Sequence, residues 1–390
     1  MAIKELVYTT KRHLESATRR SFRHSHIYEL IAASFGFNTR ASLDAAHIMV
    51  VMEAPQQPAA SSLATLQRRL AELGYEAVAD LAGAALLGMT ADRFLGIVSI
   101  ESVIWALQQG HRGDPDDWHD FDEHEVSDSE QTGNSSPSLL PTKIALLIDG
   151  LNGAASRDNA AAHYALALVH RSDDLSEEEG SSFWYSLMEQ GRDLEGAQLE
   201  WATAYKKKLL NAERKAFHLK EAARLGWAEA RLDLALENAQ RAEHQGDLGQ
   251  AEHWYKEAAG LGHVEAMRSL IWLAEESSDA DAISYWNQQA AMHGDVDAMR
   301  DLIDEDDQSN LFQNWIWVYL AEHLGTDLCK STLRAYHEGG LYADQEYDDD
   351  LGGPLYVAGD EAVQLEALSA LDDTRAKEAA KELFNRISRS

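Results

Sequence analysis

Cysteine is almost absent from this chain of 390 residues, which contains a single one, Cys329. One thiol excludes an internal disulfide framework and a cysteine-rich zinc module, and its rarity is typical of a reducing compartment. Proline is also scarce, with six residues, so few positions interrupt a helix. The sequence has neither a run of about twenty apolar residues nor the apolar core of a secretory signal. We therefore expect a cytoplasmic protein without a membrane span.

Basic side chains are few: 34 Lys and Arg stand against 66 Asp and Glu, and the formal net charge is −32. Such a chain repels phosphate backbones and anionic lipid surfaces, so we expect neither a nucleic acid nor a membrane as partner. A protein with a basic surface fits better. The N-terminal segment is the one basic stretch, with Lys4, Lys11, Arg12, Arg19, Arg20 and Arg23. Its excess of positive charge is modest, so docking against the protein's own acidic surface is at least as good an interpretation as contact with a nucleic acid.

Composition divides the chain into three parts. Residues 1–109 have apolar residues at helical spacing ahead of Gly36 and Gly74, which predicts a small helical N-terminal domain. Within it we expect a helix to enter near residues 90–92 and to run through Phe94 to Leu107. Residues 110–138 hold nine acidic residues and one arginine, which predicts a flexible acidic linker. Residues 139–390 resume the helical pattern, with an acidic insertion near 344–353.

Glycines recur at a nearly constant interval in this last part. Their separations are 35, 36, 32, 31 and 34 residues, and helical patterns lie on both sides of each; they are Gly191, Gly226, Gly262, Gly294, Gly325 and Gly359. A period of this length predicts one helix-turn-helix unit per repeat. Glycine at the turn permits the left-handed backbone that ends the first helix.

Other positions repeat in register with these glycines. Eight residues before the glycine stand Trp254, Trp286 and Trp317, and four before it stand Ala258, Ala290 and Ala321. Four residues after it stand the small residues Ala266, Ala298 and Cys329, and eight after it stand Leu270, Leu302 and Leu333. Offsets of four and eight share one helical face. Small residues at the turn let two antiparallel helices approach, and we interpret the tryptophans as core and Cys329 as a small packing residue.

Two stretches, Ala251 to Leu270 and Ser284 to Leu302, resemble the Sel1-like repeat family, which is related to tetratricopeptide repeats. The resemblance is clearest over residues 183–302. It implies right-handed superhelices that serve as adaptors in protein complexes. The predicted fold is therefore all-α: an α-solenoid of helix-turn-helix repeats preceded by a small helical domain.

Candidate partner contacts fall into two groups. Tyrosine and tryptophan are enriched at binding hot spots, and four of them lie off the repeated positions: Tyr255, Tyr285, Trp272 and Trp315. The second group is the acidic insertion, represented by Asp348, Asp349 and Asp350. Its alternating carboxylates also allow a calcium loop, although the early glycine and final glutamate of an EF-hand are missing. An exposed solvated turn is the simplest interpretation.

Evidence for catalysis is weak. The linker segment His119 to Glu125 holds ligand types that suit zinc or nickel, but we interpret it as solvated chain without a preformed site. The segment Gly150 to Gly153 lacks the strand-glycine-helix context of a phosphate-binding loop. We predict no catalytic residues, no cofactor and no metal.

Three functions remain open. The first is a non-catalytic protein-binding scaffold or adaptor that uses a helical-repeat surface. The second is an acidic inhibitor or immunity-type protein that masks a basic partner such as a toxin or nuclease. The third and weakest is a metal-dependent enzyme.

Overall fold

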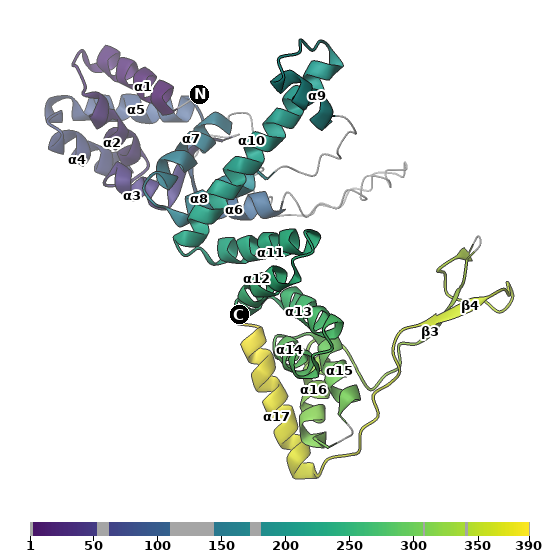
Figure 1. Ribbon diagram of the computed structural model, residues 1–390. Coiled ribbons are helices and arrows are strands. Elements are labelled where there is room, and N and C mark those ends of the chain that lie inside the picture. The colour runs from purple at the N-terminus through teal and green to yellow at the C-terminus, as the bar shows by residue number, and fades with distance from the viewer. Residues whose placement is uncertain are drawn as a thin grey trace. The chain divides into compact units, whose positions relative to one another are not determined.

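The structure is a computed structural model that describes residues 3–52, 62–109, 144–171, 181–306, 309–339 and 342–389 (Figure 1). The predicted acidic linker, with His119 to Glu125, lies outside these residues. The chain divides into two compact units, Met1–Arg231 and Leu232–Ser390.

Helices make up most of both units, and the strands among the described residues form two short antiparallel ribbons. The elements of the first unit are α1 (Ile3–Thr18), α2 (His24–Ser34), α3 (Arg40–Asp44), β1 (His47–Val51), α4 (Ser62–Glu72), the 3-10 helix η1 (Glu76–Val78), α5 (Ala79–Asp92), β2 (Leu95–Ser99), α6 (Ile100–Gln109), α7 (Ile144–Ala155), α8 (Ala160–Val169), α9 (Ser181–Glu189) and α10 (Ala197–Arg224). Those that follow are α11 (Ala228–His244), α12 (Leu248–Gly260), α13 (Val264–Glu276), α14 (Ala280–Met292), α15 (Val296–Glu305), α16 (Leu311–His323), β3 (Arg334–His337), β4 (Leu355–Ala358) and α17 (Ala370–Ile387). The all-α prediction is confirmed.

The N-terminal helices α1, α2, α4 and α5 share one core, in which Leu6, Leu30 and Leu70 are fully buried. The expectation of a helix from Phe94 to Leu107 is wrong at its start, because Leu95–Ser99 pairs with β1 before α6 begins. The β-branched residues of both strands favour this ribbon. The expected helix entry at residues 90–92 is also wrong, since these residues end α5.

Helices α7 and α8 belong to the first unit. The backbone N–H of Ile3 donates to the Asp149 carboxylate of α7 at 3.0 Å, and Gly150 lies so close to β1 that an added Cβ would stand 3.1 Å from that of Ile48. Helix α8 packs against α6 and α7. The structure thus divides the chain at 231, whereas the sequence placed the start of the repeat array at residue 139.

A single long helix, α10, occupies most of the interval between Gly191 and Gly226. The period predicted two helices there. No glycine or proline interrupts Ala197–Arg224, and alanine, leucine, lysine and glutamate dominate it, so one helix of 28 residues forms. Helix α9 packs on α10, as does α8.

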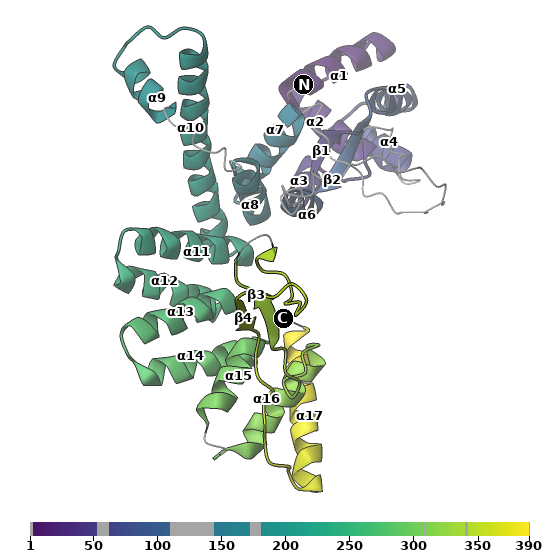
Figure 2. The same cartoon turned by 90° about the vertical axis from the view of Figure 1, so that its right-hand side faces the viewer.

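The predicted α-solenoid is present in the second unit. Consecutive helices from α12 to α15 pack against one another, and Figure 2 shows them stacked. Gly262 and Gly294 have φ of +87° and +98° and separate α12 from α13 and α14 from α15. The alanines on both sides of these turns are buried, including Ala258 and Ala266. The glycine period therefore marks the predicted helix-turn-helix units here.

The last helix-turn-helix repeat, at Gly325, departs from the pattern. After Gly325 the described residues up to Leu368 contain no second helix. The chain leaves α16 as an extended segment, forms the β3–β4 ribbon and returns to begin α17 (Figure 1). Helix α17 packs on α16. We call residues 326–369 the arm. The interpretation of Cys329 as a packing residue is wrong, because Cys329 is exposed. Leu328 is buried instead, and its carbonyl accepts a hydrogen bond from the returning Val363.

None of the described helices combines the length and the apolar character needed to cross a lipid bilayer.

Candidate binding surface on the arm

The base of the arm is fixed to α15 and α16. Arg300 of α15 donates to the carbonyl of Glu361 at 2.7 Å and lies 3.8 Å from the Asp360 carboxylate. Trp315 of α16 donates its indole N–H to the carbonyl of Glu366 at 2.8 Å. Val363 is buried in the core of the second unit. The returning strand therefore starts from a defined position on the helices.

The two strands of the arm approach closely at Gly359. The backbone N–H of Thr332 donates to the carbonyl of Asp360 at 3.0 Å, and the Asp360 N–H donates back to the Thr332 hydroxyl at 2.9 Å. Gly359 has a φ of +104°, and a Cβ there would lie 2.5 Å from the Thr332 carbonyl oxygen. Glycine is required at this position by both its backbone conformation and the lack of space.

Beyond the base, the ribbon stands clear of the helices of its own unit (Figure 1). Tyr336 of β3 stacks on Tyr356 of β4, with ring centroids 5.6 Å apart. The Tyr356 hydroxyl donates to the Asp344 carboxylate at 2.9 Å, and this hydrogen bond raises the pKa of Tyr356. His337 is buried, and its Nε2 accepts the backbone N–H of Asp348 at 3.1 Å. These contacts give the exposed ribbon a small core of its own.

The loop between β3 and β4 carries the predicted acidic residues at the surface. Asp348, Asp349 and Asp350 are all exposed. From Arg334 to Glu361 the sequence has eight acidic residues and one basic residue, a balance of −7. The one basic residue, Arg334, lies 3.9 Å from Glu346. The arm is therefore a projecting element with a large excess of negative charge.

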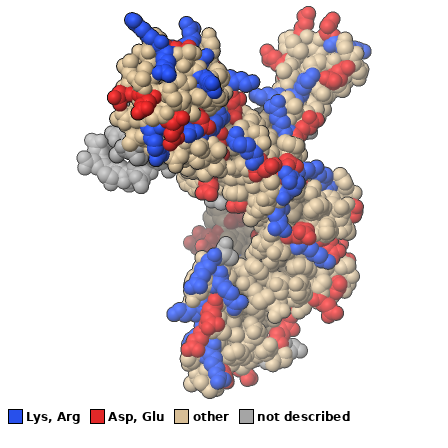
Figure 3. Space-filling view, turned by 90° about the vertical axis from the view of Figure 1, so that its left-hand side faces the viewer, with Lys and Arg blue, Asp and Glu red and all other residues tan. Residues whose placement is uncertain are grey.

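The helical faces carry a different distribution of charge. On the face in Figure 3, Lys and Arg gather over the N-terminal helices and α17, with Asp and Glu among them. In α17, for example, Lys377 pairs with Asp373 at 2.8 Å. Charges of both signs offset each other on these surfaces, whereas acidic residues far outnumber basic ones on the arm.

The four aromatic candidates lie in different surroundings. Tyr285 and Trp272 are exposed, at 53% and 42% of their surface. Trp315 packs against the core and supports the arm, so its indole N–H already has a partner within the chain. The interpretation of Tyr255 as a surface contact is wrong: its side chain is buried, and its hydroxyl donates to Glu243 at 2.7 Å. Burial and this hydrogen bond raise the pKa of Tyr255.

The reason for the error at Tyr255 is the orientation of the repeated helix. In the three repeats that contain the matched tryptophans, the position seven residues before the turn glycine is buried. Tyr255, Asn287 and Val318 occupy this position. The matched tryptophans stand one residue earlier. Trp317 is buried, while Trp254 and Trp286 are partly buried and pack against the same core. The tryptophan pattern in the sequence thus located the buried face to within one residue.

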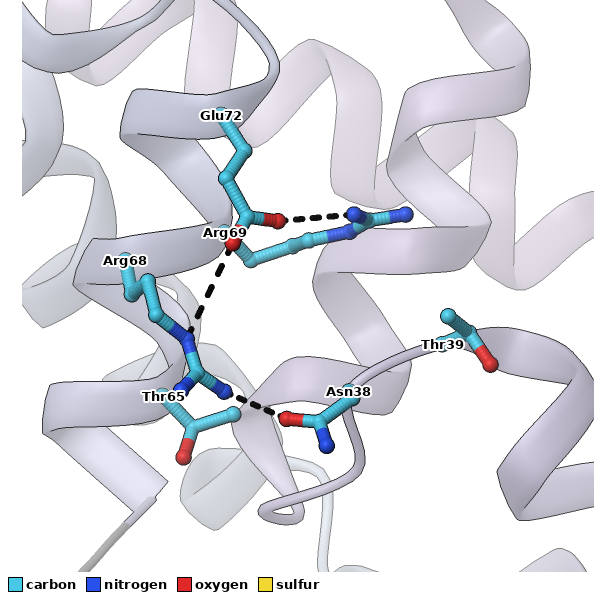
Figure 4. Close-up of a pocket in the computed structure, with 6 residues that line it drawn as sticks. All are labelled: Asn38, Thr39, Thr65, Arg68, Arg69 and Glu72. Carbon is cyan, nitrogen blue, oxygen red and sulfur yellow. Dashed lines mark hydrogen bonds and ion pairs between the residues drawn. The ribbon is translucent and has the colours of Figure 1, made fainter.

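The first unit has a concave feature among its described residues. A pocket of about 200 Å³ opens beside α4 and is lined by Asn38, Thr39, Thr65, Arg68, Arg69 and Glu72 (Figure 4). Arg69 donates to Glu29 at 2.9 Å and to Glu72 at 2.8 Å, and Arg68 bonds Asn38. Carboxylates thus already compensate Arg69 at this pocket.

No group of three or more His, Cys, Asp or Glu side chains is placed to hold a metal ion in the part of the chain that the structure describes. The carboxylates of the arm's loop are spread along an exposed chain and do not converge on one point among the residues described there.

No family model, curated protein or solved structure matches this chain. The Sel1-like resemblance therefore stays a prediction from the sequence.

Proposed function

We propose that this chain is a non-catalytic protein-binding scaffold built on Sel1-like repeats, and that its arm contacts a partner with a basic surface. The observation that carries the proposal is a projecting ribbon with a large excess of acidic residues, fixed at its base by Arg300 and Trp315. Like charges held together in a folded element repel one another, and a basic partner compensates them on binding.

The anchored base favours binding in a second way. A partner that binds a flexible segment must offset the entropy lost when that segment becomes ordered. The hydrogen bonds of Thr332, Arg300 and Trp315 fix the backbone at the base of the arm before a partner arrives. The exposed side chains of Tyr285 and Trp272, on α14 and α13, are further candidate contacts on the same unit.

An acidic inhibitor or immunity-type protein is the second candidate. The same charged arm supports it, because an acidic projection can cover the basic active site of a toxin or nuclease. The two functions differ in outcome: an inhibitor abolishes its partner's activity at equimolar concentration, whereas an adaptor leaves that activity in place. A metal-dependent enzyme remains the weakest candidate.

The test is a comparison of three forms of the full chain. In the arm variant, Asp348→Asn, Asp349→Asn and Asp350→Asn remove three negative charges. The control variant removes the same number from exposed positions on the helices, with Glu275→Gln, Glu276→Gln and Asp281→Asn. Proteins of the source cells that the wild type and the control variant retain, and the arm variant does not, are the expected partners. Identical sets of retained proteins for all three forms would contradict the proposed role of the arm.

A further inference from the structure

One edge of the β3–β4 ribbon is open. The register pairs Tyr336 with Tyr356 and His337 with Leu355. On the side of β3 opposite to β4, residues 345–347 pair with β3. The N–H of Tyr347 donates to the Ala335 carbonyl at 2.8 Å, and the His337 N–H donates to the Gln345 carbonyl at 3.0 Å. The outer edge of β3 is therefore covered, while β4 forms the other edge.

The direction of the backbone groups on β4 follows from its neighbours. The N–H of Glu338 donates to the Pro354 carbonyl, and the N–H of Thr332 donates to the Asp360 carbonyl. In an antiparallel pair, hydrogen-bonded pairs alternate with pairs whose polar groups point outward. Tyr356 and Ala358 thus face β3, and Leu355 and Val357 direct their N–H and C=O groups away from it.

The side chains at these two positions are also uncovered. Leu355 is 43% exposed and Val357 is 58% exposed. Native proteins usually protect an edge strand with a lysine, a proline, a bulge or a covering segment. The open stretch of β4 has none of these among the described residues, and Pro354 and Gly359 bound it on either side. It offers a template about four residues long.

We propose that β4 accepts an extended segment of a basic partner protein as an added strand. Backbone groups of that segment bond Leu355 and Val357, its apolar side chains cover theirs, and its basic side chains compensate the carboxylates of the arm. The inference rests on the proposed scaffold function and names how its partner is held.

A basic segment fits this edge better than a second copy of the chain. Pairing β4 with β4 would bring together two arms that each carry eight acidic residues and one basic residue between Arg334 and Glu361. Repulsion between them opposes such a dimer at low ionic strength. A lysine-rich or arginine-rich strand has the opposite charge along the whole contact.

The test uses the full chain and three synthetic peptides of eight residues in which lysine and valine alternate. One peptide is unmodified, one is N-methylated at the valines and one at the lysines. A strand directs every second N–H to its neighbour, so only one of the two methylated peptides loses its hydrogen bonds to β4. We expect the unmodified peptide to bind and the methylated pair to differ at least tenfold in affinity. Antiparallel addition predicts that methylation at valine is the damaging one.

A protein variant tests the same edge from the other side. Val357→Pro removes an outward N–H that is not needed for pairing with β3, and Val357→Thr is the matched control that keeps it. The proline variant should bind the unmodified peptide at least tenfold more weakly than the threonine variant.

Failure of this inference and failure of the scaffold function are distinguishable. Equal binding of the two methylated peptides, or no binding of the unmodified one, overturns strand addition. The scaffold proposal still stands if the arm variant loses its natural partner while the charge control retains it. A dimer in sedimentation that Val357→Pro abolishes would assign β4 to a second copy and overturn the proposal as well.

Discussion

Arg300 donates a hydrogen bond of 2.7 Å to the carbonyl of Glu361, and it stands six residues after Gly294. One repeat earlier, Arg268 stands six residues after Gly262 and bonds the Asp295 carboxylate that caps α15, at 2.5 and 2.7 Å. The arginine six residues after the turn glycine thus joins one repeat to the next at Arg268 and joins a repeat to the arm at Arg300.

Replacing Arg300 should loosen the base of the arm and leave the repeats intact. Arg300→Ala removes a hydrogen bond from a charged donor to a backbone carbonyl, worth about 1.5 to 3 kcal/mol. We expect faster hydrogen exchange over residues 328–335 and 359–365, with no change over α12 to α14. Arg334→Ala, which removes an exposed pair at 3.9 Å, is the control and should change the free energy of unfolding by less than about 1 kcal/mol.

Arg268→Ala should be more damaging, because it leaves the carboxylate of Asp295 without its cation. That side chain is 1% exposed, whereas Arg268 is 44% exposed, so solvent moderates the loss to roughly 2 kcal/mol. Denaturant unfolding of the second unit measures it. An unchanged midpoint would show that the backbone N–H groups of Asp297 and Ala298 satisfy this carboxylate alone.

The same pair gives the second unit an acid-sensitive contribution. Burial raises the pKa of Asp295, but hydrogen bonds from Arg268 and from backbone N–H groups outweigh it and lower the pKa below its ordinary value. A lowered carboxyl pKa stabilises the fold above the unfolded value of 3.8, and this contribution is lost as pH falls below it. Asp295→Asn should flatten that dependence when unfolding is followed between about pH 6 and pH 2.

Gly359→Ala should distort the base of the arm. Gly353 provides a matched control, because its φ of +101° is similar but nothing lies within 4 Å of an added Cβ. Both substitutions carry the conformational cost of a left-handed residue, about 1 to 2 kcal/mol, and the alanine at 359 also meets the Thr332 carbonyl. We expect only Gly359→Ala to accelerate exchange at Thr332 and Leu333. Equal effects of the two variants would show that the strands are not held closely there.

A histidine cluster makes the first unit sensitive to pH. His163 Nε2 donates to the Ala155 carbonyl, so its Nδ1 accepts from Nδ1 of His218 at 2.9 Å. Burial, then the neighbouring His163, His170 and Arg214, lowers the pKa of His218 from 6.5 to about 4. A lowered histidine pKa means that the unfolded state takes up a proton more readily, so stability is lost as pH falls from 6.5 toward 4. His218→Gln should flatten the pH dependence of unfolding of this unit.

The sequence predicted the regular part of this fold well. Glycines with alanines four residues away identify turns between antiparallel helices, and the structure has those turns at Gly262 and Gly294. The pattern failed at Gly325, where Cys329 and Leu333 match the repeat in sequence but not in space. The pairing of Leu328 and Thr332 with residues far along the chain is a tertiary effect, which local spacing does not reveal.

The candidate surface was predicted in part. Charge alone located Asp348, Asp349 and Asp350, because a dense acidic run is nearly always exposed. The open edge of β4 was missed, since a four-residue strand between Pro354 and Gly359 has too little periodicity to stand out. Trp315 was placed on a partner surface because sequence gives no sign that its indole bonds Glu366.

The most direct test of the central claim is the association rate constant of the purified partner with the arm variant, measured at about 50 and 300 mM salt. The account predicts at least a fivefold slower association than wild type at low salt and a smaller difference at high salt, because salt screens exposed charges. The control variant with Glu275→Gln, Glu276→Gln and Asp281→Asn should associate at nearly the wild-type rate. Equal rates for the arm variant and the wild type at both salt concentrations would contradict a binding role for the arm.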